Sequence, residues 1–125
     1  MKKLIVLILV IATMSCSKSS STGNDDQPPV VIITAPTANQ RFNAGQTVDI
    51  TGTLTDNETL AELHVHISNR ETGALLIDIH RYPSASSYEM KESFQAQAGI
   101  LYRVQVIAKD NSANEGRASV EISTN

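Results

Sequence analysis

Three histidines and one aspartate have the residue types and the spacing to bind a metal ion. His64 and His66 lie two positions apart where apolar and polar residues alternate, so on a β-strand both side chains point to the same face, with Cα atoms about 6.7 Å apart. Aligning the apolar residues of this segment with those of residues 75–80 places His80 opposite His64 and Asp78 opposite His66. Neutral imidazole and carboxylate are ligands for zinc and copper, so the pattern predicts a site for one of these ions.

The same residues allow two other interpretations. The four polar side chains could alternate with core residues and simply face water, as a half-buried sheet requires. Three protein ligands and a water molecule would also permit metal-assisted hydrolysis. The pattern places no Glu or Asp beside the histidines to orient a ligand or to act as a general base, so we expect no metal catalysis.

A second group of oxygen ligands comes between alternating segments. Asp56 and Glu58 lie in one predicted loop, and Asp110 and Glu115 lie in another. Their oxygens could hold calcium, which takes roughly six to eight oxygen ligands. The alternative is that these residues only form turns, for which short acidic and amide side chains are well suited.

Other chemistry has little support in the sequence. The serines lie in residues 17–21 and 83–87, with no glycine-framed nucleophile and no base beside them. No glycine-rich phosphate loop follows a predicted strand. Carbohydrate binding normally uses aromatic platforms, and with no Trp in the chain the plausible exposed rings are Tyr82 and Tyr88. We therefore predict a protein that is not an enzyme.

Alternation with a period of two positions the candidate ligands on strands. Val48, Ile50 and Leu54 alternate with polar residues, and the same pattern recurs along the chain. A hairpin is predicted around Glu71–Gly73, with Gly73 in the left-handed conformation and Arg70 facing Ala74. The predicted strands are seven short segments: 30–34, 47–56, 62–68, 75–80, 87–96, 101–109 and 118–123. Seven strands separated by turns and no amphipathic helix predict an all-β, antiparallel sandwich.

One of these strands carries a family resemblance. The stretch Ala98–Asp110, in which Gly99 precedes Tyr102 and the strand ends in Ala-Lys-Asp before a turn, resembles the sixth strand of fibronectin type III and bacterial immunoglobulin-like domains. The resemblance implies a seven-stranded immunoglobulin-like sandwich over residues 30–125, with the loops of Asp56 and Asp110 at one end. It also implies that the Tyr102 hydroxyl bonds to backbone and closes a corner.

The N-terminus has the pattern of an export signal. Lys2 and Lys3 precede an apolar run that ends before Cys16, the single cysteine. This arrangement resembles the lipobox of bacterial lipoproteins, which implies a signal peptide over residues 1–15, a lipid such as palmitate on Cys16, and a flexible tether over residues 16–29. The residue after the cysteine is Ser17 and not the aspartate associated with inner-membrane retention, so the resemblance favours the outer membrane.

Charge and anchoring limit the partners of the mature chain. Without the two N-terminal lysines the chain has eight basic and thirteen acidic residues, a net charge of −5, which argues against nucleic acid. We expect a lipid-anchored cell-envelope protein, periplasmic or surface-exposed, that presents loops and a sheet face to a protein or glycan. One alternative is a metal-binding envelope protein that uses the histidine strand. Another is a structural accessory subunit of an outer-membrane complex.

Overall fold

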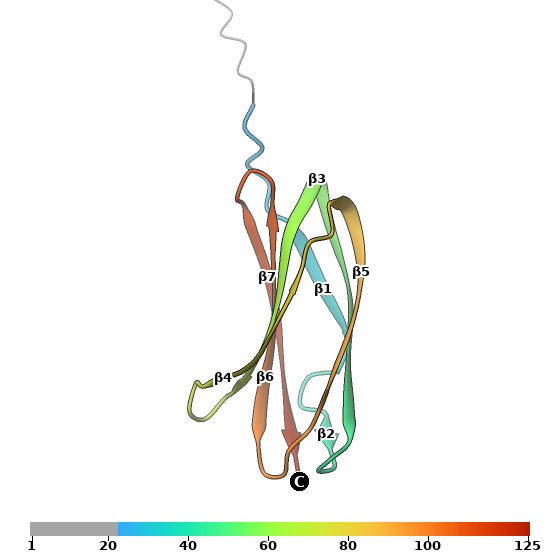
Figure 1. Cartoon of the computed structure of the whole chain (residues 1–125), viewed down its shortest axis with the longest axis vertical. Coiled ribbons are helices and arrows are strands. Elements are labelled where there is room, and N and C mark those ends of the chain that lie inside the picture. The colour runs from blue at the N-terminus through green and yellow to red at the C-terminus, as the bar shows by residue number, and fades with distance from the viewer. Residues whose placement is uncertain (1–22) are drawn as a thin grey trace, which may run out of the picture.

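The computed structural model describes residues 23–125, which form seven β-strands. The predicted signal peptide and Cys16 lie outside the described residues. The strands are β1 (Val30–Ala35), β2 (Arg41–Phe42), β3 (Thr47–Asn69), β4 (Leu75–Arg81), β5 (Ala85–Gln95), β6 (Leu101–Asp110) and β7 (Glu115–Thr124). Figure 1 shows residues 23–29 at one end of an elongated fold and the C-terminus at the other. Within residues 23–125 no helix is long and apolar enough to cross a membrane.

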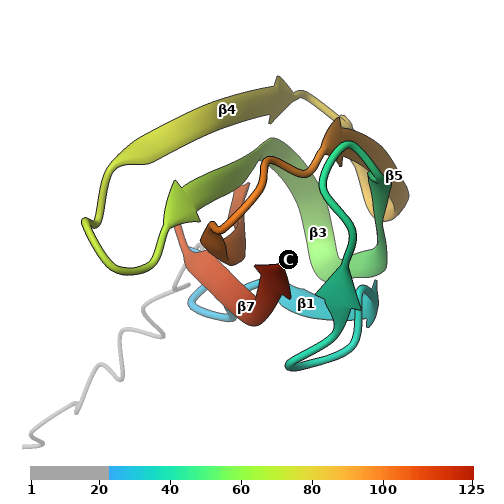
Figure 2. The ribbon, with the colours of Figure 1, turned by 90° about the horizontal axis from the view of Figure 1, so that it is seen from below.

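The long strand β3 joins two layers of sheet. Its first half pairs with β1 and β5, and its second half pairs with β4 and β6, all antiparallel. β6 pairs with β7 in antiparallel fashion, and β7 pairs in parallel with the short β2. Figure 2 shows how β3 curves, so that β4 and β1 lie on opposite sides of the fold. The predicted immunoglobulin-like sandwich is confirmed, with β3 shared between its layers. The predicted strands differ in two places: segments 47–56 and 62–68 form the single strand β3, and the short strand β2 was not predicted.

The core lies between these layers and follows the alternation of the sequence. β3 contributes alternate residues from both halves, including Ile50, Leu54 and Val65, all with no exposed surface. Gly52 interrupts this apolar series because its strand lies close to β1: a Cβ atom there would be 2.3 Å from the Ile32 carbonyl oxygen. The large apolar side chains of β3, β5, β6 and β7 are therefore mostly buried, and the intervening polar residues are left on the outer faces. In the other two long strands, Val30 and Ile32 of β1 and Leu75, Leu76 and Ile77 of β4 are exposed.

The hairpin of β3 and β4 has the predicted register over most of its length. His64 pairs with His80, and His66 pairs with Asp78. Gly73 has a φ of 73°, in the left-handed region. The predicted pairing of Arg70 with Ala74 is wrong, because the register shifts between Ile67 and Ser68. Ile67 pairs with Ile77 and Ser68 with Leu75, which leaves Leu76 as an extra residue near the start of β4.

The candidate loops differ more from the prediction. Asp56 and Glu58 lie within β3, because its backbone stays extended through an irregular stretch between Thr55 and Leu60, where the register shifts. Glu115 is the first residue of β7 and not part of a loop, because the pairing with β6 reaches it. Only the short turn after Asp110 separates β6 from β7.

Candidate metal-binding sites

The histidines lie on the outer face of β3 and β4, and we call Glu62, His64, His66, Asp78 and His80 the histidine face. His64 is at its centre, with ring centroids 4.0 Å from His80 and 5.6 Å from His66. The two strands bring these residues together because each occupies an outward position of a paired strand. The side chains of all five are part-exposed, from 18% for His64 to 41% for His80.

The two ring nitrogens of His64 face different carboxylates. Nε2 lies 2.6 Å from Oε1 of Glu62, a hydrogen-bonding distance, and Nδ1 lies 3.6 Å from Oδ1 of Asp78. A hydrogen bond donated by Nε2 to Glu62 leaves the lone pair on Nδ1, directed towards the Asp78 side. Glu62 therefore selects the tautomer of His64 that can bind a metal beside Asp78.

The carboxylate of Asp78 contacts the other two histidines. Nε2 of His66 lies 3.4 Å from its Oδ1, and Nε2 of His80 lies 2.9 Å from its Oδ2. The hydrogen bond from His80, helped by the charges of all three histidines, holds the pKa of Asp78 below its ordinary value despite partial desolvation. Asp78 is thus kept ionised, and its Oδ1 is left on the side of His64 and His66.

Two distances from Asp78 Oδ1 have the spacing of a tetrahedral site, and all three donor atoms lie within 4.8 Å of one another. Zinc bonds of about 2.0–2.1 Å to nitrogen and oxygen place neighbouring ligand atoms about 3.3 Å apart. The distances of 3.6 and 3.4 Å from Asp78 Oδ1 to the nitrogens of His64 and His66 are close to this value. Glu62 and His80 then contact the ligands rather than the ion. Sequence reasoning missed Glu62, although its position two residues before His64 places it on the same face.

A second cluster lies at the end of the fold where the described chain begins. Carboxylate oxygens of Asp25, Asp56 and Asp110 lie within 4.8 Å of one another. Asp110 is 3% exposed. Burial opposes ionisation of Asp110, yet hydrogen bonds to its carboxylate, chiefly from the side chain and backbone of Asn114, hold its pKa below the ordinary value.

The composition of this cluster differs from the prediction. Asp56 and Asp110 do come together, but Glu58 and Glu115 are not among the clustered carboxylates. Glu58 donates its backbone N–H to Asp56 Oδ2 at 3.0 Å, and the Glu115 carboxylate forms ion pairs with Lys109 and Arg117. The missed member is Asp25, which lies in a polar stretch with no alternation to indicate that it contacts the sandwich.

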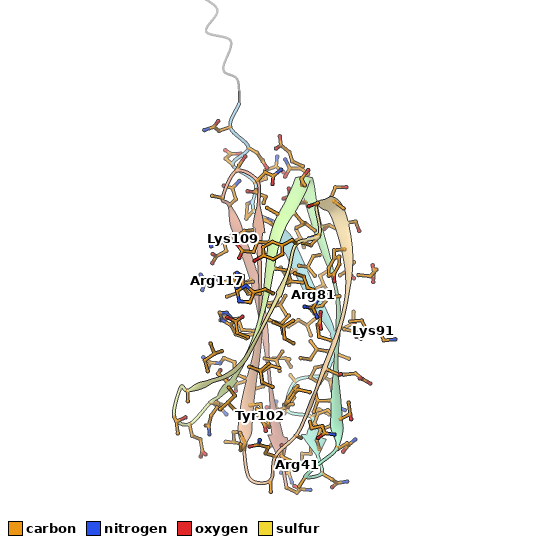
Figure 3. All side chains as sticks on the ribbon, in the orientation of Figure 1. Arg41, Arg81, Lys91, Tyr102, Lys109 and Arg117 are labelled. Atoms are coloured by element: carbon orange, nitrogen blue, oxygen red, sulfur yellow. The ribbon has the colours of Figure 1, made fainter. Side chains whose placement is uncertain are left out.

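Tyr102 lies at the opposite end of β6 from Lys109 (Figure 3). Its hydroxyl accepts a hydrogen bond of 2.9 Å from the backbone N–H of Gln97, and its ring packs edge-on against Phe94 with centroids 5.0 Å apart. Gly99, in the turn between β5 and β6, has a φ of 72°. These contacts fix the turn between β5 and β6, which is the structural role that the sequence resemblance implies for Tyr102.

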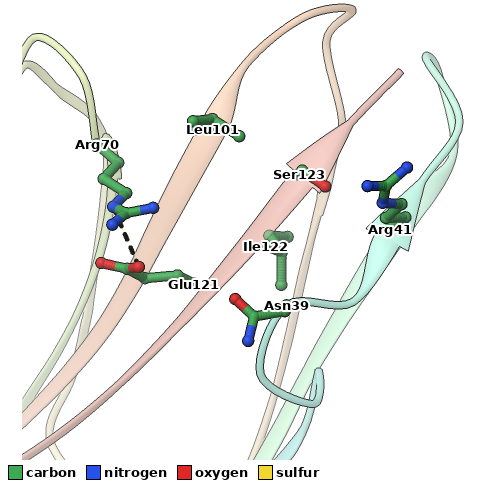
Figure 4. A pocket seen from close by; sticks show the side chains of 7 residues that line it. All are labelled: Asn39, Arg41, Arg70, Leu101, Glu121, Ile122 and Ser123. Carbon is green, nitrogen blue, oxygen red and sulfur yellow. Dashed lines mark ion pairs between the residues drawn. The ribbon is translucent and has the colours of Figure 1, made fainter.

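A shallow pocket near the C-terminal end has an ion pair at its rim. Figure 4 shows Arg70 and Glu121 facing each other at its rim, with Nε of Arg70 3.1 Å from Oε2 of Glu121. Arg103 contacts the other oxygen of Glu121 at 3.0 Å. The pocket is lined by Asn39, Arg41, Arg70, Leu101, Glu121, Ile122 and Ser123. It contains none of the predicted site residues.

Comparisons with known proteins agree with this architecture. A family described as bacterial Ig domain matches residues 29–121, whereas no curated protein sequence matches the chain. A superoxide reductase (neelaredoxin) from Ignicoccus hospitalis is similar with a TM-score of 0.56 and 10% identity, over 79% of this chain and 81% of that one. The fibronectin(III)-like modules of Clostridium thermocellum CbhA give 0.53 and 23%, over 78% and 46%. At these identities the likeness shows the fold alone.

Proposed function

Because this chain belongs to the bacterial Ig domain family, we propose that it is a non-catalytic binding module held at the cell envelope by a lipid on Cys16. The basic and apolar N-terminal pattern that ends at Cys16 supports the lipid anchor. Several acyl chains are needed for stable attachment, because a single chain binds a membrane only marginally. The outer membrane is the proposed location, with the sandwich either in the periplasm or at the surface.

We propose further that the ligand of this module is a divalent transition metal bound at the histidine face. The observation that carries this proposal is the arrangement around Asp78 Oδ1, which has one imidazole nitrogen at 3.4 Å and another at 3.6 Å. The hydrogen bond of His64 to Glu62 supports it, because metal-binding histidines generally donate their other N–H to a carboxylate or carbonyl. The face is open and lies outside the pocket, so we propose metal binding without catalysis.

Isothermal titration of the full chain in detergent with zinc tests this function. We expect one zinc per chain, with binding lost in His64→Ala and His66→Ala. Glu62→Ala should bind zinc about 10–100-fold more weakly, because only the partner of a ligand is removed. Gln105→Ala is the matched control, since Gln105 pairs with His66 from the neighbouring strand β6 and is not a candidate ligand. Equal zinc binding by His64→Ala and the control would refute the proposed metal function.

All three histidines of the chain lie on the histidine face, which gives a second measurement. Imidazole NMR signals therefore come from this site alone. Zinc should shift the signals of His64 and His66 most, and His80 less, because His80 contacts Asp78 Oδ2 and is not itself one of the three proposed ligands. A titration that perturbed His80 alone would contradict the assignment of the ligands.

The anchor is tested separately. A chain expressed with a clickable palmitate analogue should incorporate the label and partition with membranes, and Cys16→Ser should do neither. A Cys16→Ser chain that still partitioned with membranes would remove the lipid anchor. If the chain is instead an accessory subunit, cross-linking in intact envelopes would recover one outer-membrane complex irrespective of metal.

A further inference from the structure

We propose that a calcium ion binds between Asp25, Asp56 and Asp110 and joins the segment before β1 to the sandwich. This site is the acidic cluster at the end of the fold where the described chain begins. The proposal does not rest on the function proposed for the histidine face. Its three ligands come from three separate parts of the chain: the segment preceding β1, the irregular stretch of β3, and the end of β6.

The first support is charge. Three carboxylates have oxygens within 4.8 Å of one another. Among the ion pairs formed by residues 23–125, none includes Asp25, Asp56 or Asp110. The amides of Asn57 and Asn114 donate hydrogen bonds to Asp25 Oδ1 and Asp110 Oδ2 at 2.9 and 2.7 Å, but they carry no charge. A bound cation would neutralise this group of negative charges.

The second support is independent of charge and concerns individual atoms. Asp25 Oδ2 and Asp56 Oδ1 have essentially no solvent-exposed surface and no hydrogen-bond partner. Buried polar atoms are nearly always paired, and an ionised oxygen shielded from water without a partner is costly. Asp110, the third carboxylate, is 3% exposed, but both of its oxygens accept hydrogen bonds from Asn114, so the unpaired oxygens are those of the part-buried Asp25 and Asp56. The unpaired oxygens therefore lie where a cation would receive them.

The donor atoms favour calcium over a transition metal. The cluster offers carboxylate oxygens and lacks imidazole and thiolate, a set that suits hard cations. Carboxylates can bind calcium through one or both oxygens, and rotation of the Asn57 or Asn114 amide would add a carbonyl oxygen. Magnesium requires near-ideal octahedral geometry. Ligands from three separate segments are less readily held at the angles that this geometry needs.

The segment that carries Asp25 is fitted against the sandwich. Its backbone oxygen accepts a hydrogen bond of 2.9 Å from Asn114, and Pro29 at its end is buried. The backbone of Pro29 lies so close to Gly116 that a Cβ atom there would be 1.8 Å from the Pro29 carbonyl oxygen. In Figure 1 this segment runs beside the turn between β6 and β7. Calcium would thus hold the last residues of the predicted tether against the domain and shorten that tether.

The test is calcium titration of the full chain in detergent, followed by hydrogen exchange. We expect one calcium per chain, with affinity reduced about tenfold or more in Asp25→Asn, because affinity depends on the number of charged ligands. Asp26→Asn is the matched control, since Asp26 is the next residue in the chain, is exposed and lies outside the cluster. Asp25 lies outside the strands, so its substitution leaves the fold intact, whereas Asp110→Asn would also change the hydrogen bonds of Asn114 in the turn.

Hydrogen exchange reports whether the ion joins the two parts. Backbone amides of residues 25–27 should exchange more slowly in calcium than in chelator, and Asp25→Asn should abolish the difference. His64→Ala should bind calcium as the wild-type chain does, so failure of the zinc proposal leaves this one unaffected. No heat at millimolar calcium, equal affinity in Asp25→Asn and Asp26→Asn, or an equal response to magnesium would each overturn the calcium site.

Discussion

Gly116 gives a direct test of whether the segment before β1 is part of the folded unit. In Gly116→Ala the new Cβ would lie 1.8 Å from the carbonyl oxygen of Pro29. The clashing atom belongs to backbone and cannot rotate away, so either residues 25–29 or the start of β7 must move. The pairing of Gly116 with Ala108 holds β7 in place, so we expect the segment carrying Asp25 to be displaced.

The size of the effect follows from the contact. A Cβ atom essentially never lies within 3.0 Å of a heavy atom outside its own residue and its chain neighbours, so the segment must move by about 1.2 Å. Overpacking of this kind costs about 1–3 kcal/mol. For a domain of this size each kcal/mol lowers the melting temperature by about 4–8 °C. Displacement also separates Asp25 from Asp56, so calcium affinity should fall together with stability.

Urea denaturation with and without calcium measures both effects. Gly23→Ala is the control, because a Cβ at Gly23 meets nothing within 4 Å. We expect Gly116→Ala to lower the free energy of unfolding and to lose most of the stabilisation that calcium gives the wild-type chain. If Gly116→Ala were as stable as Gly23→Ala and kept its calcium response, the packing of Pro29 against β7 would be refuted.

Two further predictions concern the hydrogen bond of Tyr102 and the loss of folding stability at acid pH. Tyr102→Phe should cost about 1–2 kcal/mol in urea denaturation, because the backbone N–H of Gln97 loses its partner while the ring packing on Phe94 remains; an effect no larger than that of the exposed Tyr82→Phe would contradict the corner. Because the folded-state pKa of Asp110 is lowered, the unfolded chain takes up the proton first, so in chelator the stability from this group should be present above pH 3.8 and lost as the pH falls further. Asp110→Asn should show a flatter pH profile in this range, and an unchanged slope would contradict the prediction.

The sequence predicted the sheet well because its apolar residues have one strict period. Val65 and Ile67 can face only Ile79 and Ile77 if both strands bury the same side, which places His64 beside His80 without any tertiary information. The resemblance of the strand around Tyr102 to immunoglobulin-like domains is confirmed by the family match. Glu62 could have been found by the same rule, since it shares the outward positions of β3.

The acidic cluster was only half predictable for a physical reason. Alternation shows which side of a strand faces the core, but it does not show where a polar segment lies. Asp25 is far from Asp110 in sequence and is followed by prolines, with no apolar residue to indicate contact. Its position depends on Asn114 and on the space left by Gly116, which are features of another hairpin. Such a contact follows from tertiary structure alone.

The two sites share no ligand and differ in donor chemistry, so zinc and calcium do not compete for one site and we expect each to bind independently of the other. The histidine face offers imidazole nitrogens, which favour zinc or copper, and the acidic cluster offers oxygens alone, which favour calcium. Zinc should therefore leave the calcium affinity of the wild-type chain unchanged, and calcium should leave the zinc affinity unchanged. Linkage requires the two effects to be equal, so one titration checks the other. A measured coupling above about tenfold would mean that β3, which carries ligands of both sites, changes shape when either ion binds.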